Sequence, residues 1–149
     1  MSKLQAQISE ATKTAMKARD KSRVAVLRMV NAEFKRIEVD ERRELSDDDV
    51  IAILTRMQKQ RLDSHQQFVD AGRDELAAQE AYELELIREF LPEPLSADEL
   101  GALIEAAISS SGASAMSDMG KVMGILKAQV TGRADMGAVS KSVREKLSG

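Results

Sequence analysis

Apolar residues recur at every third or fourth position along almost the whole chain, and no segment is predicted as a strand. In the first such segment the spacing runs through Leu4, Ile8, Ala11 and Ala15. Residues three and four apart share one face of a helix, so this spacing is typical of amphipathic helices. Only two prolines interrupt the chain, and they lie close together. The sequence therefore predicts an all-α fold.

The same pattern, read with the residues that start and stop helices, predicts about seven helices. Ser46 comes before three aspartates, and Ser96 comes three residues before Glu99, as in a capping box. Charged residues 39–45 and small polar residues 109–114 break the periodicity and are expected to be loops. The predicted helices cover approximately residues 4–19, 24–37, 46–71, 74–90, 96–108, 117–131 and 135–147.

The segment Leu91–Leu95, which holds Pro92 and Pro94, predicts a domain boundary. Proline lacks the N–H that a helix needs and pushes the preceding residue out of helical geometry. We therefore expect an N-terminal helical domain over residues 1–92 and a small C-terminal three-helix domain over residues 95–149.

Few residues in the chain suggest catalysis or metal binding. There are no cysteines, which excludes disulfides and thiolate chemistry, and His65 is the only histidine. We interpret His65 as a packing or surface residue. The run Asp47–Asp49 could bind a hard metal ion, but its place in the first turn of a predicted helix favours capping and compensation of the helix dipole. The sequence predicts no catalytic residue, no metal site and no cofactor, and it leaves open whether the chain is an enzyme.

The hydropathy of the chain bears on where the protein is located. No apolar run approaches the ~20 residues of a membrane-spanning helix, and the first residues lack the apolar stretch of a signal peptide. We expect a cytoplasmic protein with no membrane partner.

The chain has a net charge of −3, but its charged residues are distributed unevenly along the sequence. Residues 1–45 and 117–149 are basic, whereas residues 46–116 carry 15 acidic and five basic side chains. Basic ends favour an anionic partner. The alternative is that the basic ends attract the acidic middle of the same chain.

Glycines cluster in the last third of the chain, although glycine destabilises a helix interior by about 0.5–1 kcal/mol relative to alanine. On a helical wheel Gly120, Gly124 and Ala128 form a stripe of small residues. One hypothesis is close packing by a neighbouring helix, and the other is that bare backbone faces an RNA or protein partner. The residues assigned to this motif are Gly120, Met123, Gly124, Gly132 and Gly137.

Basic side chains lie in and after the glycine motif. Ammonium and guanidinium groups on two adjacent helices could follow phosphates by Coulomb attraction and counterion release. The alternative is that these groups are simply solvated. No aromatic residues lie between them, so base stacking is not expected on this surface. The candidate tRNA-binding residues are Lys121, Lys127, Arg133, Lys141, Arg144 and Lys146.

Two stretches, Asp118–Gly124 and Gly132–Val139, resemble the GatB/YqeY family, and in particular a stand-alone YqeY-like protein. The resemblance spans essentially the whole chain, and its most specific part is the run Gly-Lys-Val-Met-Gly. Supporting matches are Ala15–Lys17, Leu27–Arg28, Gly72–Arg73 and Phe90–Pro92.

The resemblance implies a helical protein of two parts, whose C-terminal part is similar to the tail of the B subunit of the glutamine-dependent aspartyl/glutamyl-tRNA amidotransferase. That tail contacts tRNA, while the chemistry lies in other domains. The resemblance thus favours a non-catalytic tRNA-interacting module linked to aminoacyl-tRNA metabolism. The implied partners are tRNA and subunits of an amidotransferase or an aminoacyl-tRNA synthetase.

Two alternatives remain at this point. The resemblance also admits an accessory component of a carbon–nitrogen ligase that uses glutamine as amido-N-donor, namely a tRNA-dependent amidotransferase. The acidic cluster at Glu80, Glu83, Glu85 and Glu89 is most simply a solvated face, but it admits a protein–protein adaptor that binds a basic partner. The sequence predicts no oligomeric state.

Overall fold

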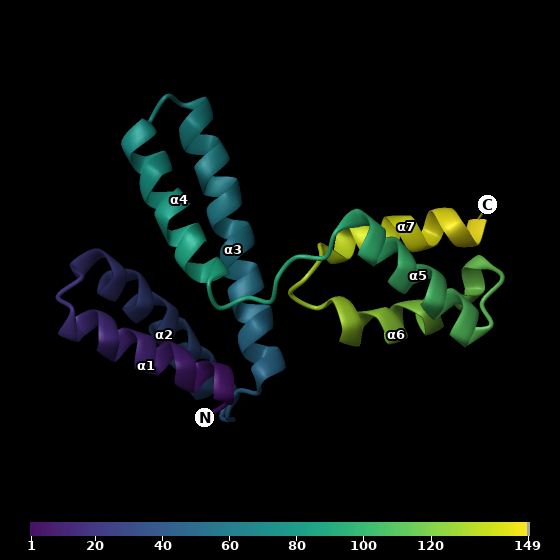
Figure 1. Cartoon of the computed structure of the whole chain (residues 1–149), viewed down its shortest axis with the longest axis horizontal. Coiled ribbons are helices and arrows are strands. Elements are labelled where there is room, and N and C mark those ends of the chain that lie inside the picture. The colour runs from purple at the N-terminus through teal and green to yellow at the C-terminus, as the bar shows by residue number, and fades with distance from the viewer. Residues whose placement is uncertain (149) are drawn as a thin grey trace. The chain divides into compact units, whose positions relative to one another are not determined.

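The computed structural model describes residues 1–148 and contains, over that range, seven α-helices, one 3₁₀ turn and no strand (Figure 1). The predicted all-α class and the count of seven helices are confirmed. The elements are α1 (Lys3–Lys17), α2 (Lys21–Glu41), α3 (Asp47–Asp70), α4 (Asp74–Arg88), α5 (Ala97–Ser111), the 3₁₀ turn η1 (Met116–Asp118), α6 (Met119–Val130) and α7 (Met136–Ser148).

Helices α1 to α4 form one compact unit, Met1–Leu91. Its apolar core is continuous from α1 to the end of α4, as the amphipathic spacing predicts. Polar contacts between α1 and α2 flank this core, since Asn31 Nδ2 donates to Thr12 Oγ1 at 2.8 Å. The core residues are Ile8, Ala15, Val26, Leu27, Val30, Phe34, Leu45, Val50, Ile53, Leu54, Met57, Leu86 and Ile87.

The start of α3 is fixed by the side chains that precede and open it. Ser46 Oγ accepts from the Asp49 N–H at 3.2 Å, and the Asp49 carboxylate accepts from the Ser46 N–H at 2.9 Å, which completes a capping box. Asp47 Oδ1 also accepts from the Leu4 N–H at 2.9 Å, so the same turn satisfies a free donor at the start of α1. Asp47 and Asp49 of this turn thus act as caps.

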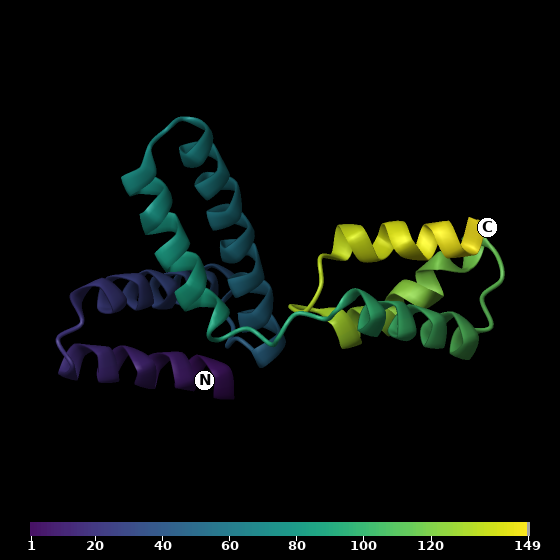
Figure 2. The same cartoon turned by 45° about the horizontal axis from the view of Figure 1, so that its top comes forward.

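Helices α3 and α4 form a hairpin whose far half projects beyond the α1–α2 pair (Figures 1 and 2). Within it Arg61 Nε lies 3.4 Å from Glu83 Oε2, and both side chains are about 85% buried. Glu80 lies nearby, and burial, followed by the charge of Glu83, raises the pKa of its carboxyl. Tyr82, on α4, is 38% exposed. The cluster of acidic residues on α4 is therefore partly buried and only partly solvated.

Two helices are longer than predicted. Helix α2 continues to Glu41 because exposed charges support its last turns, as in the Arg36–Asp40 pair at 3.3 Å. Helix α5 continues to Ser111, and the hydroxyl of Ser111 bonds back to the Ile108 carbonyl at 3.0 Å. In both cases local hydrogen bonds extend a helix beyond its apolar pattern.

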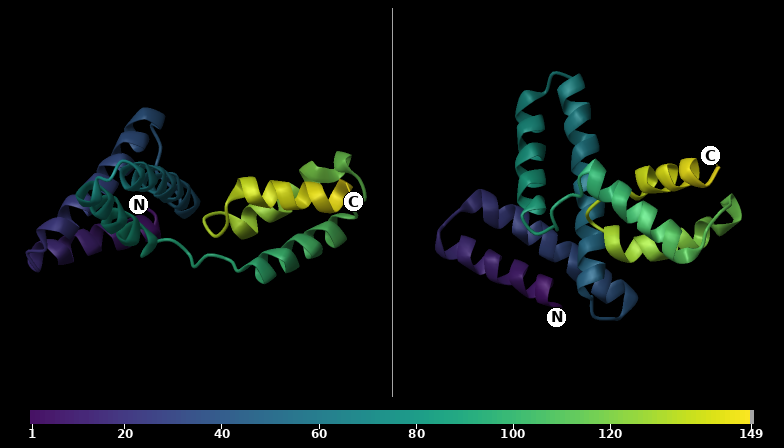
Figure 3. Two further views of the ribbon diagram at one scale, coloured as in Figure 1. Left: turned by 90° about the horizontal axis from the view of Figure 1, so that it is seen from above. Right: turned by 45° about the vertical axis from the view of Figure 1, so that its right-hand side comes forward.

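Helices α5, α6 and α7 form the second compact unit, Pro92–Gly149. Each of the three contacts the other two, and Figure 3 allows this green-to-yellow bundle to be followed from two further sides. The Leu95 N–H donates to the Arg133 carbonyl at 2.8 Å, which ties the entry of α5 to the α6–α7 turn. The core residues are Ile104, Ala107, Val122, Leu126, Val130, Val139, Val143 and Leu147.

The domain assignment of 1–92 and 95–149 stays a prediction, which separate expression of the two units tests. No helix over residues 1–148 is long and apolar enough to cross a membrane.

Candidate nucleic-acid interface

Charge within the second unit is divided between its helices. Residues 92–116, which include α5, carry four acidic and no basic side chains, whereas residues 117–149 carry six basic and three acidic ones. The positive charge therefore belongs to α6, α7 and the turn between them.

Three of the six candidate cations are held by groups of the same unit. Lys121 Nζ lies 3.9 Å from Asp118 Oδ1, and Lys146 forms an ion pair with Glu105 of α5. Arg133 Nε donates to the Glu93 carbonyl at 3.0 Å. These three side chains already have electrostatic or hydrogen-bonding partners, so part of their binding capacity is used inside the bundle.

The other three cations, Lys127, Lys141 and Arg144, are exposed, and none forms an ion pair with any residue from 92 to 148. A side chain that has no partner in the fold keeps its full charge for an external anion. We therefore distinguish these three, which we call the free cations, from the paired ones.

Helix geometry places two of the free cations along the seam between α6 and α7. The Ser140 hydroxyl lies 4.0 Å from the Met123 sulfur, so these residues mark the edges at which the helices meet. Lys127 follows Met123 by four residues, and Arg144 follows Ser140 by four, so each stays on the same edge. The helices run antiparallel (Figure 1), and the two positions are separated by about 12 Å along the seam. Lys141 lies one turn from Arg144 on the same side of α7.

The glycine stripe of α6 lies on the surface of the second unit. Gly120, Gly124 and Ala128 are exposed, and a Cβ at either glycine would meet no atom within 4 Å. No helix of residues 92–148 packs on the stripe. Close packing by a neighbouring helix therefore stays a prediction, as does contact with an RNA or protein partner. The spacing revealed a face of small residues but could not show which way that face pointed.

The other motif residues have separate local roles. Gly132 has φ +76°, a left-handed conformation that favours glycine and forms the α6–α7 turn. Gly137 is exposed, and its N–H donates to Asp135 Oδ1 at 3.3 Å, so Asp135 caps α7. Met123 is half-buried and packs against the core. Gly132 thus shapes the turn between α6 and α7, Gly137 lies in the capped first turn of α7, and Met123 contributes to the apolar core.

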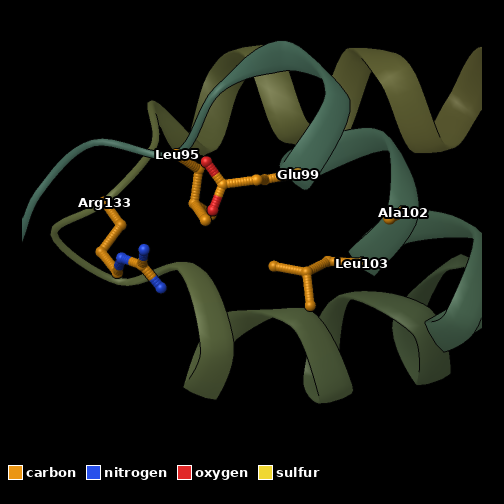
Figure 4. A pocket seen from close by; sticks show the side chains of 5 residues that line it. All are labelled: Leu95, Glu99, Ala102, Leu103 and Arg133. Atoms are coloured by element: carbon orange, nitrogen blue, oxygen red, sulfur yellow. The ribbon is translucent and has the colours of Figure 1, made fainter.

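Arg133 lies apart from the free cations, at a surface hollow of about 350 Å³. Figure 4 shows its guanidinium and the Glu99 carboxylate on the same side of the hollow, with Leu103 pointing inward. Hydrogen bonds from the hydroxyl and the N–H of Ser96, and then the charge of Arg133, lower the pKa of Glu99. Glu99 thus stays ionised beside Arg133 and offsets its charge.

The described part of the chain, residues 1–148, contains no group of three or more His, Cys, Asp or Glu side chains placed to hold a metal ion. His65 is half-buried on α3, and its charge acts on Glu80. Both residues belong to the packing of the α3–α4 hairpin.

Sequence reasoning treated the six cations as one set and missed their division into free and paired groups. One pairing had a sequence signal, because Asp118 and Lys121 are three residues apart, the spacing of neighbours on a helix surface. The Lys146–Glu105 pair spans 41 residues and had none.

Comparison with known proteins adds the family. A family model described as "Yqey-like protein" matches residues 5–147, nearly the whole chain. No curated protein matches it.

Proposed function

Since the chain belongs to the YqeY-like protein family, we propose that it is a non-catalytic module that contacts tRNA through α6 and α7. The observation that carries this proposal is the set of free cations, Lys127, Lys141 and Arg144, on two adjoining helices. The resemblance of Asp118–Gly124 and Gly132–Val139 to the amidotransferase tail supports tRNA as the polyanion. We extend the proposal to its partners, which are subunits of an amidotransferase or an aminoacyl-tRNA synthetase.

The physical basis is electrostatic. Each cation that meets a phosphate releases condensed counterions, which makes binding favourable and dependent on salt. The acidic α5 repels phosphates, so the charge division of this unit also orients the RNA toward α6 and α7. A net charge of −3 on the whole chain keeps binding weak, which suits a module that acts beside other proteins.

The test compares tRNA binding by the full chain over a range of salt concentrations. In the triple variant Lys127→Gln, Lys141→Gln, Arg144→Gln we expect the slope of log K against log salt to fall by about 0.7–0.9 for each phosphate that the protein no longer neutralises. The measurement is a series of titrations with labelled tRNA.

A matched control removes positive charge from the paired cations instead. The variant Lys121→Gln, Arg133→Gln, Lys146→Gln removes the same number of charges but should change the slope much less, because Asp118, Glu99 and Glu105 already offset these charges. Equal slopes in the two variants would show that net charge alone, and not this face, governs binding. An absence of tRNA binding by the wild-type chain at low salt would end the proposal.

A further inference from the structure

We propose that the α6–α7 face binds a base-paired stem of RNA through its backbone, and not unpaired bases. This inference rests on the proposed function and names the part of the RNA that the face contacts.

The first support is the composition of the second unit. Residues 92–149 contain no Phe, Tyr or Trp, and the four aromatic residues of the chain, Phe34, Phe68, Tyr82 and Phe90, all belong to the first unit. Proteins hold unpaired bases mainly by stacking them on aromatic rings. A face without rings lacks the main means of holding splayed bases, whereas the phosphates of a stem need only cations.

The second support is the lack of an amide side chain next to Lys127. Adenine is typically read by Asn or Gln, and Gln129 is the only such residue in 117–149. Gln129 lies two residues from Lys127, and so on the opposite side of α6. The surface next to Lys127 therefore offers no amide to read adenine, and contacts of Lys127 with phosphates carry no sequence information.

The third support is the shape of the face beside Lys127. Gly120 lies about 20° from Lys127 around α6, and Gly124 about 60°. Both glycines are exposed, and no residue from 92 to 148 covers them. The minor groove of an RNA helix is wide and shallow and displays 2′-hydroxyls and phosphates. A flat helix face edged by cations can approach such a groove closely, while a projecting side chain could not.

The experiment measures binding of the full chain to three labelled probes of equal length. These are a perfect RNA stem of arbitrary sequence, an unstructured single-stranded RNA, and a stem of the same composition with its sequence scrambled. We expect the stem to bind about tenfold more tightly than the single strand and the two stems to bind equally. Tighter binding of the single strand overturns this inference and leaves the proposed function standing. Binding of no probe at low salt overturns both.

A substitution on the exposed stripe of small residues tests whether the RNA lies on this face. Ala128→Phe places a ring on the exposed stripe, so it should strengthen single-strand binding and weaken stem binding. Ala106→Phe is the matched control, because Ala106 is also exposed but lies on the acidic α5. If Ala128→Phe leaves the ratio of the two affinities unchanged, the RNA does not lie on this face and the inference is wrong.

Discussion

Asp49 shows how one carboxylate can stabilise a helix start. It accepts from Arg43 Nη1 at 2.6 Å and from the Ser46 N–H at 2.9 Å, and these bonds, led by that of Arg43, hold its pKa well below the ordinary value of 3.8. A lowered pKa contributes stability that is present above the unfolded value and is lost as the pH falls through the folded one.

We therefore expect Asp49→Asn to lower the melting temperature of the first unit at neutral pH by about 4–8 °C, for a loss of about 1 kcal/mol. The difference from wild type should shrink below pH 3.8. Thermal unfolding followed by circular dichroism measures it. Asp48→Asn is the control, since Asp48 is exposed in the same first turn. An equal effect of the two substitutions would assign the loss to the helix dipole and not to the Asp49 contacts.

Glu80 presents the opposite case. Burial, and then the nearby Glu83, raise its pKa above 4.5. A raised carboxyl pKa means that the folded state holds the proton more tightly than the unfolded one, so stability falls as the pH rises from 4.5 through the folded pKa.

Glu80→Gln should therefore raise the melting temperature at neutral pH, and this gain should disappear in acid below pH 4.5. Glu85→Gln serves as a control on the same helix, because the Glu85 side chain is 74% exposed. Melting curves across this pH range provide the test. A gain that persists unchanged in acid would mean that ionisation of Glu80 is not its cause.

Among the elements, α6 is destabilised by its own glycines. Gly120→Ala and Gly124→Ala should each stabilise the bundle by about 0.5–1 kcal/mol, since both sites are helical and a Cβ meets only open space. Gly112→Ala should destabilise instead, because Gly112 ends α5 at φ +68°. Urea unfolding of the three variants measures these changes in the free energy of unfolding. A loss of stability in Gly124→Ala would show that the stripe is covered in solution.

Helix boundaries were predictable where a capping side chain defined them and not where exposed polar residues did. Ser46, Ser96 and Asp135 cap the helices as their sequence positions indicate. The last turns of α2 and α5 were missed because they are held by ion pairs and by serine hydroxyls, which leave no apolar period. The orientation of the small-residue stripe on α6 stayed undecided for a related reason, since small residues suit close packing and exposure equally well.

At the scale of the whole molecule, the chain contains two apolar cores that have no residue in common. Each core comes from consecutive helices, so each unit contains the residues that it needs to fold.

We predict that residues 92–149, expressed alone, form a helical and cooperatively folded domain of low stability, as is usual for domains of about 60 residues. Denaturant titration followed by circular dichroism tests this. Residues 1–91 should retain their helicity in the same way. A 92–149 fragment without cooperative unfolding would show that the two units depend on each other.

The sequence was sufficient for the fold class, the helix count and the family, because these depend on periodicity and on motifs spread along the chain. The candidate interface was only partly predictable. Which cations are free depends on contacts between distant positions, such as Lys146 and Glu105, and on which side of α6 faces outward.

The position of Tyr82 has an optical consequence. The chain has no tryptophan, and Tyr82, half-exposed on α4, is its one tyrosine, so the entire near-ultraviolet emission of the protein comes from the first unit. The bundle of α5, α6 and α7 contains no aromatic residue and contributes nothing to this emission. A change in tyrosine fluorescence on adding RNA, after correction for absorption by the RNA, would therefore report an event in the first unit, and not in the helices for which we propose phosphate contacts.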